Sequence, residues 1–206
     1  MPLPPIDQKG IFLNIPYDEE FRSLYLAYIV GLCSLGFVPH IASEIPGGAR
    51  RLDRILELIQ SCRYSIHDLS RVELSAPPNG TPRFNMPLEL GITIAWTHLH
   101  PRLHNYFVFE SEPYRIQRST SDLNGTDAYV HRGTAEGVLS ELRSAFWRDD
   151  APTVPQMLDI HNWVEIGLLA ILRVNGTNNP YTQSVFRDLC SLSTRLFELF
   201  HPLRKS

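Results

Sequence analysis

The stretch RFNMPLELGI, residues 83–92, places a single carboxylate among apolar side chains. Pro87 disfavours helical geometry at the residue before it, so we predict a helix with Met86 as its N-cap and Pro87 as its first residue. Glu89 then occupies the third helical position, where the helix dipole favours an ionised carboxylate. A capping-box glutamate is common there, but that motif needs a hydroxyl at the cap, which Met86 lacks. Glu89 is therefore either a helix-end charge or a carboxylate that stabilises, or covalently traps, an oxocarbenium-like cation.

A second group of polar residues, His67-Asp68-Leu69-Ser70-Arg71, ends a strand-like run that begins at Arg63. An Asp at a strand end often forms a turn by accepting hydrogen bonds from nearby backbone N–H groups. Three ionisable residues within five positions also indicate a functional site. If both residues still belong to the strand, His67 and Asp68 project to opposite sides of it. We keep both interpretations open for Asp68 and favour a functional role for His67 less.

A third polar segment, Asn14-Ile15-Pro16-Tyr17, follows the apolar run that begins at Gly10. It matches neither glycine-rich phosphate-binding pattern, GxGxxG or GxxxxGK[ST]. The simplest interpretation is a strand-to-helix turn in which Asp18 or a neighbour caps the next helix. The alternative is that Asn14 directs its amide into a site at the strand end.

Histidines and cysteines offer weaker candidates. Three histidines surround Pro101 without the helical HxxxH spacing of a zinc site, so we expect a surface turn there. The cysteines have no CxxC pair and no histidine at metal-ligand spacing, so we expect buried free thiols. These residues are His98, His100 and His104, and Cys33, Cys62 and Cys190.

Short apolar runs alternate with helical periodicity through the first 150 residues, which predicts βαβ units and an α/β fold. The sheet is expected to be mostly parallel, with helices on both faces. Ligands of such sheets bind at the carboxyl ends of the strands, here just after Ile15, Ala42, Asp68 and Phe109. The expected strands are 10–16, 37–42, 63–69, 105–109 and 129–130, and the expected helices are 18–35, 52–59, 87–98 and 134–147. Pro39 favours an edge position for the second strand.

The sequence Asp149-Asp150-Ala151-Pro152 predicts a boundary between an α/β domain, 1–150, and a helical extension, 151–206. Within the extension, residues 156–172 are rich in Leu and Ile. A narrow apolar stripe suits packing against another helix, in the same chain or in a second subunit. We therefore expect a homo-oligomer or a partner subunit to bind through these helices. The stripe consists of Val185, Leu189, Leu192, Leu196 and Leu199.

The overall composition excludes several classes of protein. The net charge of −3 and the absence of a Lys/Arg run argue against direct nucleic-acid binding. No apolar run reaches the ~20 residues that a membrane span needs. The N-terminal MPLPPIDQKG has no hydrophobic secretory segment. We expect a cytoplasmic protein.

Three segments together, IFLNIPYDEEF, IHDLSR and FNMPLELGI, resemble the nucleoside 2-deoxyribosyltransferase-like superfamily, which is close in fold to bacterial TIR domains. The likeness covers about residues 10–110 and implies a flavodoxin-like sheet. In that family a glutamate in an E-[LIM]-G motif attacks or stabilises the anomeric carbon as an N-glycosidic bond breaks. By position this glutamate falls on Glu89, the family's strand-end acid on Asp68, and its first-strand loop on residues 14–17.

The resemblance implies an N-glycosidase or glycosyltransferase that cleaves the base–ribose bond of NAD or a (deoxy)nucleotide, as a bacterial anti-phage defence effector; it leaves open whether water or another acceptor takes the sugar. It requires no metal and no bound cofactor. The alternative is a non-catalytic module that senses a nucleotide, or serves as a scaffold, through the same cleft. Arginine suits bidentate phosphate binding. The expected catalytic residues are Glu89 and Asp68, and the expected substrate-binding residues are Asn14, Ile15, Pro16, Tyr17, Ser70, Arg71, Arg83 and Asn85.

Overall fold

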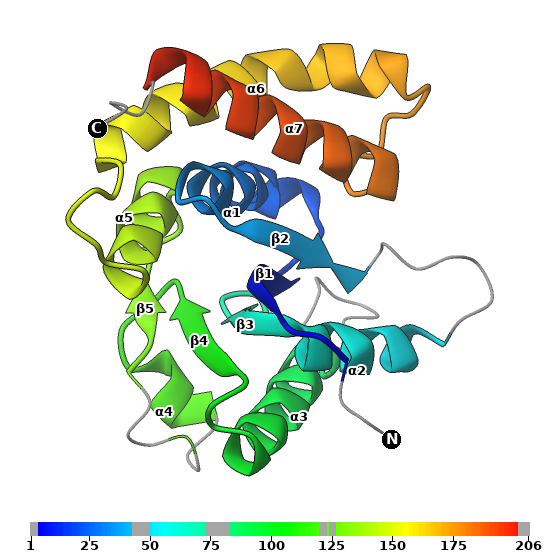
Figure 1. Ribbon diagram of the computed structural model, residues 1–206, viewed down its shortest axis with the longest axis vertical. Helices are drawn as coiled ribbons and strands as arrows, with labels where there is room; N and C mark the ends of the chain where they lie inside the picture. Colours follow the sequence, from blue (N-terminus) through cyan, green and yellow to red (C-terminus); the bar gives the residue numbers. More distant parts are fainter. Residues whose placement is uncertain (1–3, 43–49, 73–82, 120–122, 124–126, 202–206) are drawn as a thin grey trace. The chain divides into compact units, whose positions relative to one another are not determined.

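The computed structural model describes residues 4–42, 50–72, 83–119, 123 and 127–201 (Figure 1). The chain divides into two compact units. The first comprises Met1–Pro16 with His40–Arg132, and the second Tyr17–Pro39 with Gly133–Ser206. This division differs from the boundary expected at residue 150, because an early helix, 22–34, packs with three helices that follow residue 134.

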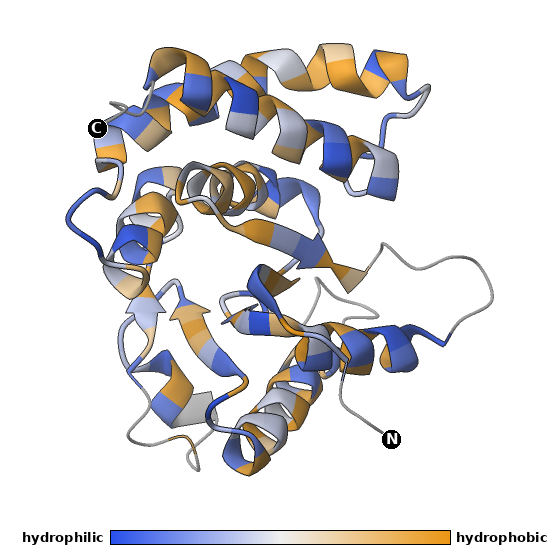
Figure 2. Cartoon of the chain, in the orientation of Figure 1, coloured by the Kyte–Doolittle hydropathy of each residue, from blue (hydrophilic) through white to orange (hydrophobic). Residues whose placement is uncertain are grey.

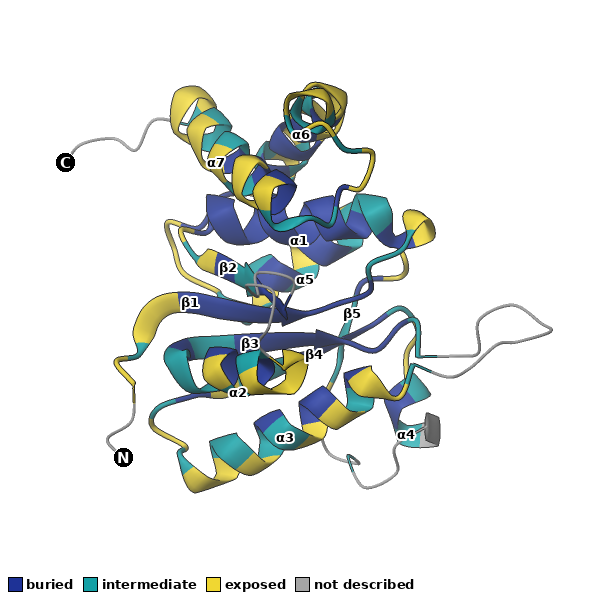
Figure 3. Ribbon diagram, turned by 90° about the vertical axis from the view of Figure 1, so that its right-hand side faces the viewer, coloured by how far each residue is buried: buried dark blue, intermediate teal, exposed yellow. Residues whose placement is uncertain are grey.

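The sheet has five parallel strands in the order β2-β1-β3-β4-β5. The predicted α/β class, with a parallel sheet flanked by helices and a pair of C-terminal helices, is confirmed. β2 lies at the edge, as Pro39 indicates, and the strand order changes direction between β1 and β3, where ligands of such folds bind. Figure 3 shows β1 and β3 buried along most of their length. The strands are β1 (Asp7–Asn14), β2 (Val38–Ile41), β3 (Cys62–Asp68), β4 (Asn105–Glu110) and β5 (Tyr129–Val130).

In the first unit, α2 (Arg51–Ser61) and α3 (Asn85–Leu99) cover the sheet face that carries Phe12 and Val108. The buried stripe of α2 packs on β1, while the first turns of α3 pack on β3 and β4 and on α4 (Arg115–Ser119). The packed residues include Ile55, Leu58 and Ile59 of α2, and Met86 and Leu90 of α3. Both helices follow a strand, so their N-termini begin at the edge where the strands end.

The second unit is helical. A short 3₁₀ helix, η1 (Glu19–Phe21), leads into α1 (Arg22–Ser34), which is almost entirely buried and predominantly hydrophobic (Figure 2). It packs with α5 (Ala135–Ala145), α6 (Val154–Val174) and α7 (Gln183–Phe200). Gly31 permits the close approach of α5, because a Cβ there would lie 2.6 Å from Cδ1 of Leu142.

The predicted stripe on α7 packs partly within the same unit. Val185 and Leu189 are buried, whereas Leu199 near the end of the helix is exposed. α6 begins with a capping box, in which the Thr153 hydroxyl and the Gln156 side chain each bind the other's backbone N–H. No helix in the described ranges is long and apolar enough to span a membrane.

Candidate functional site

Asn14 and His67 meet at the edge where β1 and β3 end. They are register partners in the two parallel strands, and both are buried. Nδ2 of Asn14 lies 2.9 Å from Nδ1 of His67 and donates a second hydrogen bond to the carbonyl oxygen of Met86 at 3.1 Å. The amide of Asn14 therefore ties the first turn of α3 to the end of β1.

The start of α3 differs from the prediction. The helix begins at Asn85, its N-cap is Phe84, and no side chain caps it. The prediction of Met86 as N-cap and Pro87 as first residue is wrong. Pro87 is tolerated as the third residue because the first four N–H groups of a helix have no partner within it. Glu89 is consequently the fifth helical residue, one turn in from the helix start.

Glu89 lies in an almost completely buried position beside one cation. Its side chain is 4% exposed, and Oε1 is 3.9 Å from Nη2 of Arg51, the first residue of α2. Burial raises the pKa of Glu89 to about 7, while Arg51 and a hydrogen bond with Asn85 act in the opposite direction. The effect of burial on the pKa of Glu89 is therefore larger than the opposing effects of Arg51 and Asn85. Near neutral pH, such a carboxyl group is able to accept or donate a proton.

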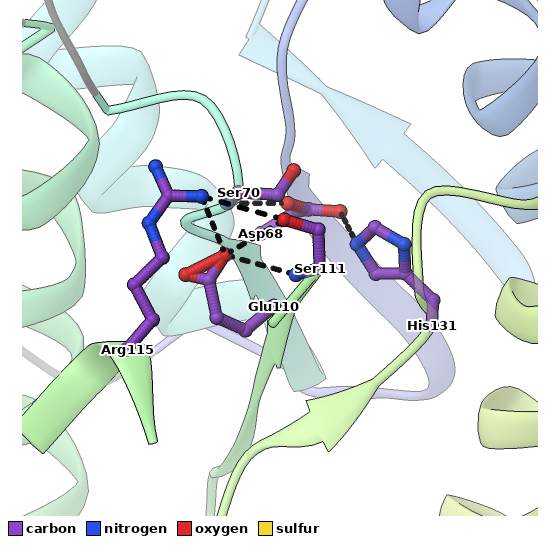
Figure 4. A network of polar contacts seen from close by, with 6 residues as sticks. All are labelled: Asp68, Ser70, Glu110, Ser111, Arg115 and His131. Carbon is purple, nitrogen blue, oxygen red and sulfur yellow. Dashed lines mark hydrogen bonds and ion pairs between the residues drawn. The ribbon is translucent and has the colours of Figure 1, made fainter. Parts of the chain in front are cut away.

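Asp68 has surroundings different from those of Glu89. It is the last residue of β3 and is fully buried. Oδ1 accepts a hydrogen bond from the backbone N–H of Ser70 at 2.9 Å, and Oδ2 is 3.2 Å from Nε2 of His131 (Figure 4). Both oxygens of Asp68 therefore have partners within the protein. Its neighbour His67 projects to the opposite side of the strand, toward Asn14, as the alternation of strand residues predicts.

Two further ionisable residues, Glu110 and His131, join Asp68 at this edge and were assigned no role from the sequence. Glu110 ends β4, and His131 directly follows β5, donating its backbone N–H to the Glu110 carbonyl at 2.9 Å. Oε1 of Glu110 accepts a hydrogen bond from the Ser111 N–H at 2.9 Å and lies 3.6 Å from Nη1 of Arg115 (Figure 4). Glu110 is the polar last residue of an otherwise largely apolar strand, and His131 is the polar residue directly after one, the pattern that marks a strand end.

Burial raises the pKa of Glu110, and the charge of Asp68 adds to this effect. The Ser111 N–H, Arg115 and His131 oppose it. The cluster therefore holds two buried carboxyl groups between two basic side chains. Its described His, Cys, Asp and Glu side chains do not form a group of three or more that is able to hold a metal ion.

The other predicted residues of the first unit occupy varied positions. Ile15 and Pro16 are buried, so their side chains contribute to packing. Arg71 and Arg83 are half-buried, and Asn85 is exposed. The N–H of Arg83 bonds the Val72 carbonyl at 3.2 Å. In the sequence, Pro77, Pro78, Asn79, Gly80 and Pro82 predict a long loop, and these residues lie outside the described part of the chain.

Tyr17 belongs to the second unit. Its ring packs edge-on against Tyr25 and Tyr181, with ring centroids 6.0 Å and 5.7 Å away. Asp18 accepts a hydrogen bond from the Phe21 N–H at 3.1 Å and caps η1. The simpler of the two sequence interpretations, a capped turn, is therefore confirmed for Asp18.

His104 is not in a surface turn, as the sequence suggested, but buried in the first unit. Its Nε2 is 3.0 Å from Oγ of Ser65, and its Nδ1 is 2.9 Å from the carbonyl oxygen of Cys62. The same serine lies 3.1 Å from Nε2 of His67. A buried imidazole is stable here because both ring nitrogens find partners. These partners are distant in sequence, and no local pattern indicated them.

Comparison of the chain with protein-family models, with curated proteins and with solved structures found no match.

Proposed function

We propose that the protein is an N-glycosidase that cleaves the base–ribose bond of a nucleotide, either NAD or a (deoxy)nucleotide, with Glu89 acting at the anomeric carbon. The observation that carries the proposal is the position of Glu89. It is a nearly buried carboxyl group in the first turns of α3, which Asn14 ties to the end of β1. This is the strand edge where the strand order changes direction, the usual ligand position in such folds.

The proposed step needs a carboxylate close to the sugar. The bond between C1′ and the base nitrogen breaks, its electron pair leaves with the base, and positive charge develops at C1′. Glu89 stabilises this charge or bonds to C1′ before a water oxygen takes its place. The attacking water loses one proton, which goes to the departing base where that base leaves as an anion and otherwise to solvent. With a pKa of about 7, Glu89 is ionised in a substantial fraction of molecules at neutral pH. A cationic substrate group next to it would favour the ionised form further.

Asp68 takes a supporting role in this proposal. Both of its oxygens are occupied, by the Ser70 N–H and by His131, and the residue is fully buried. We therefore assign Asp68 to holding the ends of β3 and β5 in place beside the ligand, and not to direct contact with the sugar. Arg71, Arg83 and the exposed Asn85 remain the candidates for contact with phosphate and base.

The same observation on Asp68 favours a second candidate function. If the strand-end acid is engaged within the protein, the edge is suited to binding a nucleotide without cleaving it. In that case the protein is a nucleotide-sensing module, and Glu89 contributes to affinity alone.

The decisive experiment measures free base released from NAD, nucleotides and deoxynucleosides. The wild-type protein is compared with Glu89→Gln and with Glu57→Gln, a control on α2 whose side chain is 67% exposed and pairs with Arg54. We expect the wild-type and the control to release base equally and Glu89→Gln to be slower by at least about 100-fold. Equal release by wild-type and Glu89→Gln refutes the role of Glu89. Tight binding without release by the wild-type supports the sensing module.

The C-terminal helices supply a surface for a second copy of the chain or a partner subunit. On α6, Trp163, Ile166 and Leu169 follow at three-residue spacing and are 53%, 70% and 66% exposed. Exposed apolar residues in a contiguous patch mark interaction surfaces. We propose that α6 makes this contact.

We also propose that the protein acts in the cytoplasm, where free nucleotides are its substrates.

A further inference from the structure

A chain of four buried hydrogen bonds runs along β3, from the strand end toward its beginning. Nδ2 of Asn14 lies 2.9 Å from Nδ1 of His67, and Nε2 of His67 lies 3.1 Å from Oγ of Ser65. Oγ of Ser65 is 3.0 Å from Nε2 of His104, and Nδ1 of His104 is 2.9 Å from the carbonyl oxygen of Cys62. Asn14, Ser65, His67 and His104 are all buried.

The direction of each bond follows from chemistry. The Asn14 atom that faces the Met86 carbonyl must be the NH₂ nitrogen, which only donates, so Nδ1 of His67 accepts. Nε2 of His67 then carries the hydrogen and donates to Ser65. At the other end the Cys62 carbonyl only accepts, so Nδ1 of His104 donates to it. Ser65 therefore donates its single hydroxyl hydrogen to Nε2 of His104.

Both imidazoles of the chain are neutral. Burial, with a smaller contribution from His104, lowers the pKa of His67 to about 3, and burial also lowers the pKa of His104. The opposite tautomer of His67 would place a hydrogen on Nδ1, facing the NH₂ group of Asn14. The hydrogen bonds accordingly permit a single arrangement, and that arrangement fixes the orientation of the Asn14 amide.

A fixed amide has a consequence for ligand binding. Both hydrogens of the Asn14 NH₂ group are used, one by His67 and one by Met86. Oδ1 has no donor among the described residues, so it is an acceptor held in one direction at the end of β1. A group that only accepts selects a ligand atom that donates.

We propose that His67 is a positioning residue that locks the amide of Asn14, so that Oδ1 of Asn14 accepts a hydrogen bond from a sugar hydroxyl of the bound nucleotide. The inference rests on the proposed function, since it names the sugar as the recognised group at the same edge. A site built to bind a hydroxyl discriminates against an analogue that lacks it. His67 therefore sets sugar specificity without touching the ligand.

The first test observes directly which imidazole nitrogen of His67 carries the hydrogen. In a ¹⁵N-labelled wild-type protein, NMR of the imidazole nitrogens is expected to show His67 with a bare Nδ1 and a protonated Nε2, unchanged between about pH 5 and pH 8. A protonated Nδ1, or titration of His67 within this range, overturns the inference. This measurement needs neither a ligand nor a substitution.

The second test measures the affinity of AMP, 2′-deoxy-AMP and 3′-deoxy-AMP. For the wild-type we expect at least one deoxy form to bind about tenfold more weakly than AMP. His67→Leu removes the acceptor for Asn14 and should reduce this ratio toward one, whereas His67→Asn places an amide oxygen near the position of Nδ1 and should restore it. Three results would overturn the proposal. The wild-type does not discriminate among the nucleotides, a folded His67→Leu protein discriminates as fully as the wild-type, or a folded His67→Asn protein does not restore the ratio.

The outcomes separate this inference from the proposed function. If the wild-type discriminates among the three nucleotides but releases no base from any substrate, the N-glycosidase proposal fails and the role of His67 stands. If base is released but His67 has the opposite tautomer, the role of His67 fails and the enzyme stands.

Discussion

Glu89→Gln should stabilise the protein at neutral and alkaline pH, because the folded structure buries a carboxyl group that must ionise there. The pKa of Glu89 rises from 4.5 to about 7 on burial. Since one pKa unit corresponds to about 1.4 kcal/mol, the ionised form costs the folded state roughly 3 kcal/mol. Glutamine has nearly the same shape and no charge, so the variant avoids this cost.

The sign of the pH dependence follows from proton binding. Between pH 4.5 and about 7 the folded protein holds the Glu89 proton more tightly than the unfolded chain does. The wild-type therefore loses stability as the pH rises through this window. The difference in the free energy of unfolding between Glu89→Gln and wild-type should grow from near zero at pH 4.5 to roughly 3 kcal/mol above pH 7.

Urea unfolding of both proteins between pH 4.5 and pH 8 measures this difference, with Glu57→Gln as the exposed control. The control should follow the wild-type at every pH. A constant difference between Glu89→Gln and wild-type across the whole range would refute the reasoning, because it would mean that Glu89 titrates as it does in the unfolded chain. A gain in stability together with a loss of base release would also indicate that the charge is retained for function.

Three further predictions concern packing, the buried hydrogen bonds and assembly. Gly31→Ala should destabilise the protein by about 1–2 kcal/mol in thermal unfolding, because the energetic cost of overpacking against Leu142 exceeds the gain from the higher helix propensity of alanine. An increase in stability would contradict the close packing of α1 and α5. Ser65→Ala should lower the free energy of unfolding by about 1–3 kcal/mol, since Nε2 of His67 loses its acceptor. An unchanged free energy of unfolding would argue against the series of buried hydrogen bonds along β3. Ile166→Glu should reduce the mass measured by light scattering to that of one chain without changing the melting temperature; an unchanged oligomer would show that α6 is not the contact.

The elements of the fold were largely predictable because the apolar runs are short and well separated. The runs at 105–109 and 63–69 gave β4 and β3 within one residue at each end, and Pro39 indicated the edge strand. The start of α3 was not predicted correctly. Proline biases the residue before it against helix, but packing of Met86 on Leu69 and Val108 is the stronger influence here.

The candidate site was predictable only where a residue's role is local. Glu89 and Asn14 stand out by position, and the strand-end rule pointed to the residue after Phe109, where Glu110 lies. The partners of these residues depend on contacts between segments far apart in the sequence. His104 binds Ser65 and Cys62 across about 40 residues, and His131 reaches Asp68 across more than 60. The large upward pKa shift of Glu89 likewise required its burial, which the three-dimensional structure provides.

A crystal structure of Glu89→Gln with an uncleaved nucleotide tests the central claim most directly. Our account predicts C1′ of the sugar within about 3–3.5 Å of the side chain at position 89, the distance at which reacting atoms are positioned for attack. It also predicts a sugar hydroxyl hydrogen-bonded to Oδ1 of Asn14. A nucleotide bound elsewhere, or bound at this edge with C1′ turned away from position 89, would contradict the account.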